Sequence, residues 1–184
     1  MSPLSQIASV TQTLLQAYAV ARQHAGEGVC IVVLHIGTEQ SGIAVGLGPD
    51  ADLVKPLPMG SERTAREYFK TTPPTPLAME HAIQVVEDVV MPLSADIPRA
   101  ALLFSADTTL RTIALLAGVE QTEPMRLTLE AMERLFNRLS AMVEGSPAAH
   151  QGLPESNTFA ATLLILREFM HHLQFGQIEV KHAP

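Results

Sequence analysis

A short polar turn between two apolar segments is the part of this sequence best suited to chemistry. Residues 32–46 read as strand, turn and strand, and the first strand ends at Gly37. Gly42 follows the turn, and we expect it to adopt the positive φ that a tight hairpin needs. A glycine-rich turn of this kind lets backbone amides approach a phosphate group. Thr38 and Glu39 instead bring side chains, one of them acidic, into the turn.

A second polar loop precedes a predicted helix and offers the same kind of chemistry. Residues 105–109 read Ser-Ala-Asp-Thr-Thr, and apolar spacing predicts a helix over residues 108–117. Backbone amides at the start of such a helix can hold an anion. The alternative is that Asp107 caps the helix and that Ser105 packs locally. The sequence favours this alternative, because an acidic side chain already stands at the capping position.

The histidines and the single cysteine give no metal-binding pattern. His171 and His172 are neighbours on a predicted helix, about 100° apart, so they cannot chelate one ion side by side. His35 stands between apolar residues, and we expect it to be a buried histidine with its hydrogen bonds satisfied. Cys30 lies in an apolar segment, where burial raises the pKa of a thiol and disfavours nucleophilic attack. We therefore expect no metal site and no cysteine chemistry.

Composition and charge narrow the class of protein. The 184 residues are 47% hydrophobic and 17% charged, which is typical of a folded chain. The formal net charge of −7 and the absence of a Lys/Arg run argue against a nucleic-acid partner. No apolar run approaches about twenty residues and no secretory leader is visible, so we expect no membrane partner. A lone cysteine suits a reducing compartment, and the expected location is the cytoplasm.

The hydrophobic periodicity predicts an α/β fold with a mixed sheet. Three strands joined by hairpins come first and are expected to be antiparallel, and later strands join in parallel through crossover helices. Pro56 and Pro58 place the third strand at an edge or bend it. This order suits a ribonuclease-H-like or actin-like lobe better than a Rossmann fold. The expected helices cover residues 5–23, 61–69, 76–91, 108–117, 127–143 and 156–173, the expected strands residues 29–36, 42–47, 53–59, 100–104 and 178–180, and residues 145–154 form a loop.

We expect these elements to form a single domain over residues 1–184. Residues 1–25 hold the first helix, a possible interface element, and residues 26–184 hold the actin-like lobe. Ser61 and Thr75 are the expected N-caps of the second and third helices.

Five segments also carry a family likeness. They are residues 35–46, residues 55–60 (Lys-Pro-Leu-Pro-Met-Gly) followed by residues 63–69, residues 73–76 with their helix, residues 103–114, and residues 152–155 with the closing helix and strand. In this order they resemble motifs of the exopolyphosphatase/guanosine-pentaphosphate phosphohydrolase family, within the actin-like superfamily. The chain is similar to the C-terminal lobe of that family over about residues 25–182, and the second segment is the closest match.

The resemblance implies a phosphate site whose residues have changed. By family position the phosphate-binding residues are Gly37, Thr38, Ser41, Ser105, Thr108 and Thr109. His35 stands where the family has an aspartate, and Thr38 and Glu39 stand where it has two glycines. A Cβ at those positions pushes the backbone away from a phosphate, and Glu39 adds negative charge beside a negative ligand. The family's N-terminal lobe, which supplies the general base and half of the cleft, has no counterpart among these residues.

From these changes we expect a non-catalytic binding or scaffolding module, working as a homodimer or with a separately encoded second lobe. The alternative is an active phosphohydrolase on polyphosphate or on a nucleotide such as guanosine pentaphosphate. In that case Glu39 or Asp107, the two candidate catalytic residues, holds Mg²⁺ or water, and a dimer mate or second subunit completes the cleft. Mg²⁺ is the only cofactor we consider, and only for this alternative.

Overall fold

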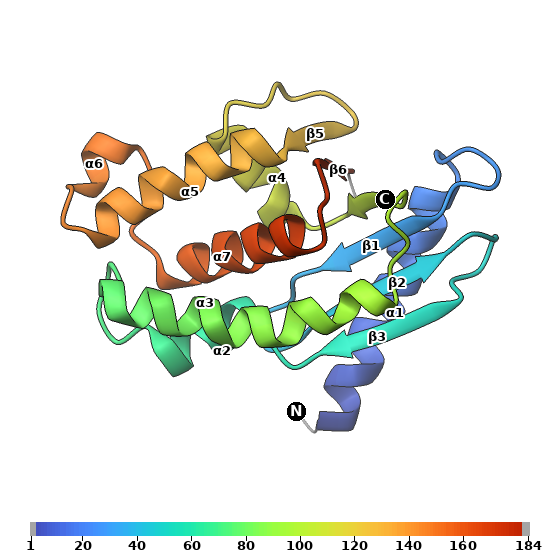
Figure 1. The fold of residues 1–184 in the computed structure, drawn as a ribbon, viewed down its shortest axis with the longest axis horizontal. Helices are drawn as coiled ribbons and strands as arrows, with labels where there is room; N and C mark the ends of the chain where they lie inside the picture. The colour runs from blue at the N-terminus through green and yellow to red at the C-terminus, as the bar shows by residue number, and fades with distance from the viewer. Residues whose placement is uncertain (1–2, 182–184) are drawn as a thin grey trace.

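The computed structural model describes residues 3–181, and its six strands form one mixed sheet (Figure 1). Residues 1–2 and 182–184, the two ends of the predicted domain, lie outside the described residues. In chain order the elements are α1 (Pro3–Arg22), β1 (Ile31–His35), β2 (Ser41–Gly46), β3 (Leu53–Leu57), α2 (Ser61–Tyr68), α3 (Pro76–Val90), the 3-10 helix η1 (Met91–Ala95), β4 (Leu102–Ser105), α4 (Thr108–Leu116), β5 (Met125–Thr128), α5 (Leu129–Val143), α6 (Ala148–Gln151), α7 (Asn157–His172) and β6 (Gln177–Val180).

The sheet has the strand order β3-β2-β1-β4-β6-β5. β2 pairs antiparallel with both β1 and β3, and β3 lies at an edge, as Pro56 and Pro58 indicated. β4 runs parallel to β1, and β6 runs parallel to β4. The predicted fold class, three antiparallel strands followed by parallel strands with crossover helices, is confirmed.

The strand β5 was not predicted. Residues 125–128 form this strand at the second edge of the sheet, antiparallel to β6. We expected the following helix to begin at residue 127, whereas α5 begins at Leu129, where Thr128 Oγ1 accepts a hydrogen bond from the Ala131 amide. A strand of four residues has too few alternations to stand out against a strongly amphipathic helix. The predicted loop over residues 145–154 likewise contains the short helix α6.

Helix α1 covers one face of the sheet and lies behind the strands in Figure 1. An added Cβ at Gly42 would lie 2.7 Å from Leu14 Cδ1, and one at Gly46 would lie 2.5 Å from Tyr18 Oη. These two β2 glycines therefore let α1 approach the sheet closely. The expectation of a positive φ at Gly42 is wrong, because Gly42 is a paired residue inside the strand. The side chains that α1 buries are Val10, Leu14, Tyr18 and Ala21.

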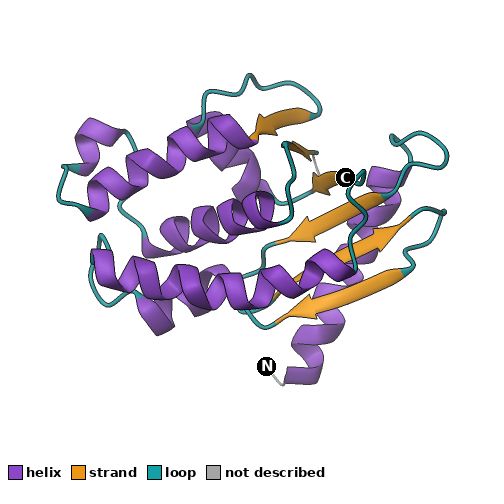
Figure 2. Cartoon of the chain, in the orientation of Figure 1, coloured by secondary structure: helices purple, strands orange, loops and turns teal. Residues whose placement is uncertain are grey.

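The other face of the sheet carries most of the helices, with α7 between α3 and α5 (Figures 1 and 2). Ten of the sixteen residues of α7 are buried, so this helix is the centre of the helical layer. The predicted apolar face of α5 packs against the same core through Met132, Leu135, Phe136 and Leu139. Within residues 3–181, no helix is both long enough and apolar enough to cross a membrane.

Candidate functional site

The predicted phosphate turn between β1 and β2 is bound to the start of α2. The Gly37 carbonyl accepts a hydrogen bond from the Ser61 amide at 2.9 Å, and the Thr38 carbonyl accepts from the amides of Glu62 and Arg63 at 2.9 and 3.1 Å. These three amides belong to the first turn of α2, which is the part of a helix that can otherwise bind an anion. In this protein the hairpin's own carbonyl oxygens occupy those donors.

Gly60 makes this contact between the turn and α2 possible. An added Cβ there would lie 2.6 Å from the Glu39 carbonyl carbon and 2.7 Å from that of Thr38, so the turn leaves no room for a side chain. Gly60 is also the N-cap residue of α2. The prediction that Ser61 caps this helix is wrong, because Ser61 is the first helical residue and its own amide is bound to the hairpin.

The acidic residue of the turn, Glu39, is held by an arginine of α2. Arg66 donates from Nη1 and Nη2 to the two Glu39 carboxylate oxygens at 2.6 and 2.8 Å. This hydrogen bonding lowers the pKa of Glu39 below its ordinary value. The carboxylate is therefore ionised at neutral pH, and both of its oxygens already have a cationic partner.

The second candidate acid, Asp107, joins the end of β1 to the start of α4. His35 Nδ1 lies 2.6 Å from Asp107 Oδ1, and the Ile36 amide donates to Asp107 Oδ2 at 2.7 Å. Asp107 occupies the N-cap position of α4, but its side chain makes no capping hydrogen bond. The expected side-chain cap is therefore wrong, because the carboxylate turns toward β1 instead. Ser105 packs locally as expected, since Ser105 Oγ accepts from the Asp107 amide at 3.2 Å. His35 is half-buried rather than buried, and its Nδ1 is bound to Asp107.

The remaining residues named by family position fall in different surroundings. Thr108 and Thr109 are exposed on the first turn of α4, whereas Ser41 is buried at the start of β2, and its Oγ has no hydrogen-bond partner among residues 3–181. The two loops do meet, because β1 and β4 are parallel neighbours whose carboxyl ends lie at the same edge of the sheet. A cavity of about 210 Å³ between the hairpin and α1 is lined by Gln6, Ser9, Val10, His35, Gly37, Thr38, Glu39 and Gln40.

The sequence alone does not predict which side chains bind Glu39 and Asp107. Arg66 lies 27 positions after Glu39, and His35 lies 72 positions before Asp107. Only the family likeness indicated that the two loops belong together. The resulting pair of His35 and Asp107 has a definite chemical capacity, because a carboxylate on Nδ1 orients an imidazole and leaves Nε2 as its second polar atom.

The mixed sheet, its crossover helices and the two loops at the carboxyl ends of β1 and β4 define an α/β lobe. A model of the Ppx/GppA phosphatase family matches residues 7–183, and the chain belongs to this family. A sequence search of curated proteins gives no match.

Solved structures of similar fold are larger than this chain. A PPX-GPPA enzyme of Aquifex aeolicus superposes with a TM-score of 0.76 at 19% identity, over 94% of this chain and 60% of that one. An exopolyphosphatase from Cytophaga hutchinsonii gives a TM-score of 0.73 at 16% identity, over 95% of this chain and 59% of that one. The chain thus spans about 60% of the length of these solved proteins, and at such low identity the likeness shows the fold alone.

Proposed function

We propose that this chain is a non-catalytic member of the Ppx/GppA family that works as a protein-binding or scaffolding module. The observation that carries the proposal is the bidentate contact of Arg66 with Glu39, at 2.6 and 2.8 Å, in the turn that the family uses for phosphate. The guanidinium of Arg66 competes with Mg²⁺ or a water molecule for both oxygens of this carboxylate.

The backbone of the same turn supports this proposal. The Gly37 and Thr38 carbonyls accept from the first amides of α2, so those amides are not free to bind a phosphate oxygen. The carboxylate of Asp107 is likewise bound, to His35 and to the Ile36 amide. The two candidate catalytic acids, Glu39 and Asp107, therefore both make contacts that stabilise the fold, at positions where an active relative could use an acid for catalysis.

The test is an assay of phosphate release. The full chain is incubated with polyphosphate, guanosine pentaphosphate, ATP and a chromogenic phosphate ester, each with Mg²⁺ and with Mn²⁺. We expect release at the level of a blank that contains no protein. Turnover of any of these compounds that follows the folded chain through purification would overturn the proposal.

One observation favours the second candidate, an active phosphohydrolase. His35 has its Nδ1 on Asp107 and lines the cavity beside the turn, which is the arrangement of a histidine that accepts a proton from water. An enzyme of this kind needs Mg²⁺ at the phosphate and a second lobe, from a dimer mate or another subunit, to close the cleft. In the phosphate-release assay, an active phosphohydrolase would turn over substrate as the wild type and would lose that turnover in the His35→Asn variant, whereas a non-catalytic module would show no turnover in either.

We also propose that the chain is a homodimer whose contact is the exposed apolar part of α1. Leu15, outside the row of side chains that packs on the sheet, is 46% exposed, and Ile7, which continues the row of Val10 and Leu14 toward the start of the helix, is 38% exposed. Burying such side chains against a second copy removes apolar area from water. The expected single domain, with residues 1–25 as its interface element, is part of this proposal.

Light scattering coupled to size exclusion measures the state of the chain directly. We expect the mass of a dimer for the wild type and of a monomer for the Leu15→Glu variant, because a buried carboxylate opposes association. Leu77→Glu is the matched control, since Leu77 is an exposed leucine, 76% accessible, on a different helix, and we expect it to remain dimeric. A monomeric wild type, or a dimer that survives Leu15→Glu, contradicts this interface.

A further inference from the structure

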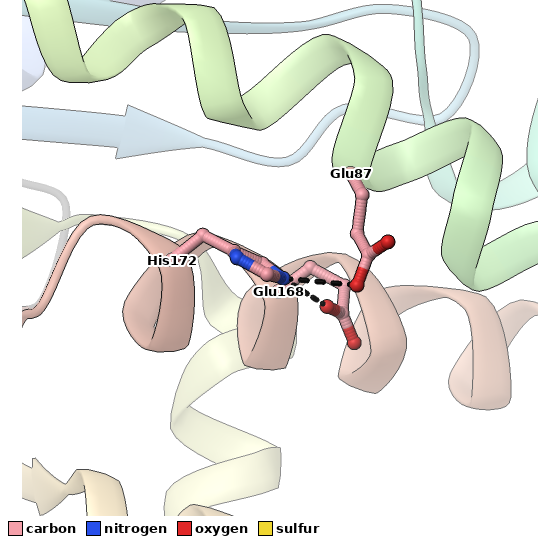
Figure 3. A group of neighbouring side chains, drawn as sticks. All are labelled: Glu87, Glu168 and His172. Atoms are coloured by element: carbon pink, nitrogen blue, oxygen red, sulfur yellow. Dashed lines mark hydrogen bonds and ion pairs between the residues drawn. The ribbon is translucent and has the colours of Figure 1, made fainter.

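Three side chains that can ligate a metal ion meet between α3 and α7, away from the hairpin turn. Figure 3 shows Glu87 of α3 reaching toward Glu168 and His172, which are four residues apart on α7. His172 Nε2 lies 3.0 Å from Glu87 Oε1 and 3.1 Å from Glu168 Oε2. One ligand atom from each of the three residues falls within 4.8 Å of the others. Residues four apart share one face of a helix, so α7 presents both of its ligands to α3.

The burial of Glu168 makes this trio different from an acidic patch on the surface. Its side chain is fully buried at 0% exposure, and such a carboxylate requires positive partners. One oxygen accepts from Arg167 Nη1 at 2.7 Å, and the other faces His172. Arg167 is shared, because its Nε also donates to Glu133. The ionic partner of Glu87 is His172.

Carboxylates outnumber guanidinium groups in the ion pairs of this cluster. Among the described residues, three carboxylates, those of Glu87, Glu133 and Glu168, pair with the guanidinium of Arg167 and with two imidazoles, and Arg99 lines a cavity beside His172. A divalent cation between Glu87, Glu168 and His172 would supply two positive charges at this point.

The separations also suit a metal ion with short bonds. Two ligands at about 2.0–2.1 Å from a tetrahedral zinc ion lie about 3.3–3.4 Å apart. The observed distances from Nε2 to the two carboxylate oxygens, 3.0 and 3.1 Å, are close to this separation, and the two oxygens lie within 4.8 Å of one another. One imidazole and two carboxylates suit zinc and its neighbours in the first transition row better than Mg²⁺, which prefers oxygen ligands and bound water.

We propose that Glu87, Glu168 and His172 bind one divalent transition-metal ion of the zinc type. The three protein ligands are Nε2 of His172, Oε1 of Glu87 and Oε2 of Glu168, and the neutral imidazole carries its proton on Nδ1 when Nε2 binds the metal. Arg167 keeps the second Glu168 oxygen in place, as an outer partner of a metal-binding carboxylate commonly does. The sequence analysis singled out no trio of this kind, although the four-residue spacing of Glu168 and His172 is visible in the sequence.

The test is titration of the full chain, freed of metal by a chelator, with zinc in a calorimeter. We expect one equivalent of zinc to bind per chain and the melting temperature to rise with zinc concentration. The Glu87→Gln and His172→Ala variants are each expected to bind zinc at least tenfold more weakly. Titration with Co²⁺, followed by its visible absorption, reports the geometry and the ligands without reference to any activity.

His171→Ala is the matched control, because His171 is the adjacent histidine, half exposed and outside the trio. We expect this variant to bind zinc like the wild type. Folding of every variant is checked by circular dichroism without metal. If His172→Ala does not fold, the zinc affinity of Glu87→Gln alone tests the proposal. Absence of stoichiometric binding, or equal binding by the wild type and the trio variants, overturns the proposal and leaves a network of ion pairs. The proposal is independent of whether the chain hydrolyses phosphate.

Discussion

We expect the Asp107→Ala variant to lose about 2–3 kcal/mol of unfolding free energy, because it removes two hydrogen bonds to a charged acceptor and strands a buried donor. The carboxylate binds His35 Nδ1 at 2.6 Å and the Ile36 amide at 2.7 Å. Ile36 is only 5% exposed, so its amide has little access to water once the carboxylate is gone. Unfolding in urea, followed by circular dichroism, measures the loss.

Two further variants separate this contact from a general effect of losing an acid. Asp107→Asn keeps an oxygen that can accept from the Ile36 amide, and we expect it to lose about 1 kcal/mol. Asp50→Ala removes an exposed aspartate from the turn between β2 and β3 and is expected to stay within about 0.5 kcal/mol of the wild type. If Asp107→Ala is as stable as Asp50→Ala, the carboxylate does not join β1 to α4.

The second large effect is expected at Gly60, where alanine should cost about 1–3 kcal/mol. The added methyl group would lie 2.6 Å from the Glu39 carbonyl carbon, and backbone atoms of the turn cannot move aside as a flexible side chain can. The turn must shift away from α2, which weakens the hydrogen bonds from Ser61, Glu62 and Arg63. Urea unfolding measures this loss, and hydrogen exchange of those amides locates it.

Gly176→Ala is the matched control for Gly60→Ala. An added Cβ at Gly176 meets no heavy atom within 4 Å, and its φ is not in the left-handed region. We expect this variant to be as stable as the wild type or slightly more stable, because alanine restricts the unfolded chain. Equal stability of the two alanine variants, with unchanged exchange of the α2 amides, contradicts the close contact between the turn and α2.

Much of the fold could be predicted from local patterns. Apolar segments separated by polar turns gave β1, β2 and β3, and the prolines placed β3 at an edge. Apolar spacing gave α5 and α7, and Thr75 caps α3 by accepting from the Ala78 amide, as predicted. The strand β5 was not predicted. Its four residues are stabilised as a strand by pairing with β6, about fifty positions away in the sequence.

The candidate site was less predictable, because side chains there choose distant partners. The sequence places Asp107 correctly at the start of α4, but a carboxylate at that position can bind its own helix or a neighbouring strand, and only the packing of β1 beside β4 decides. Gly42 shows the same limit, since a glycine before an apolar strand fits a tight turn as well as the close approach of a helix. The homodimer and the cytoplasmic location stay predictions.

Phosphate release by the purified full chain, with Mg²⁺ and polyphosphate or guanosine pentaphosphate, is the most direct measurement of the central claim. Wild type, His35→Asn and Glu39→Gln are compared at equal concentrations of folded protein. We predict that all three remain at the level of the blank. Arg66 binds the Glu39 carboxylate, and the first amides of α2 are already bound to carbonyl oxygens of the turn. Steady turnover by the wild type that falls at least tenfold in either variant would contradict the account and identify an active phosphohydrolase.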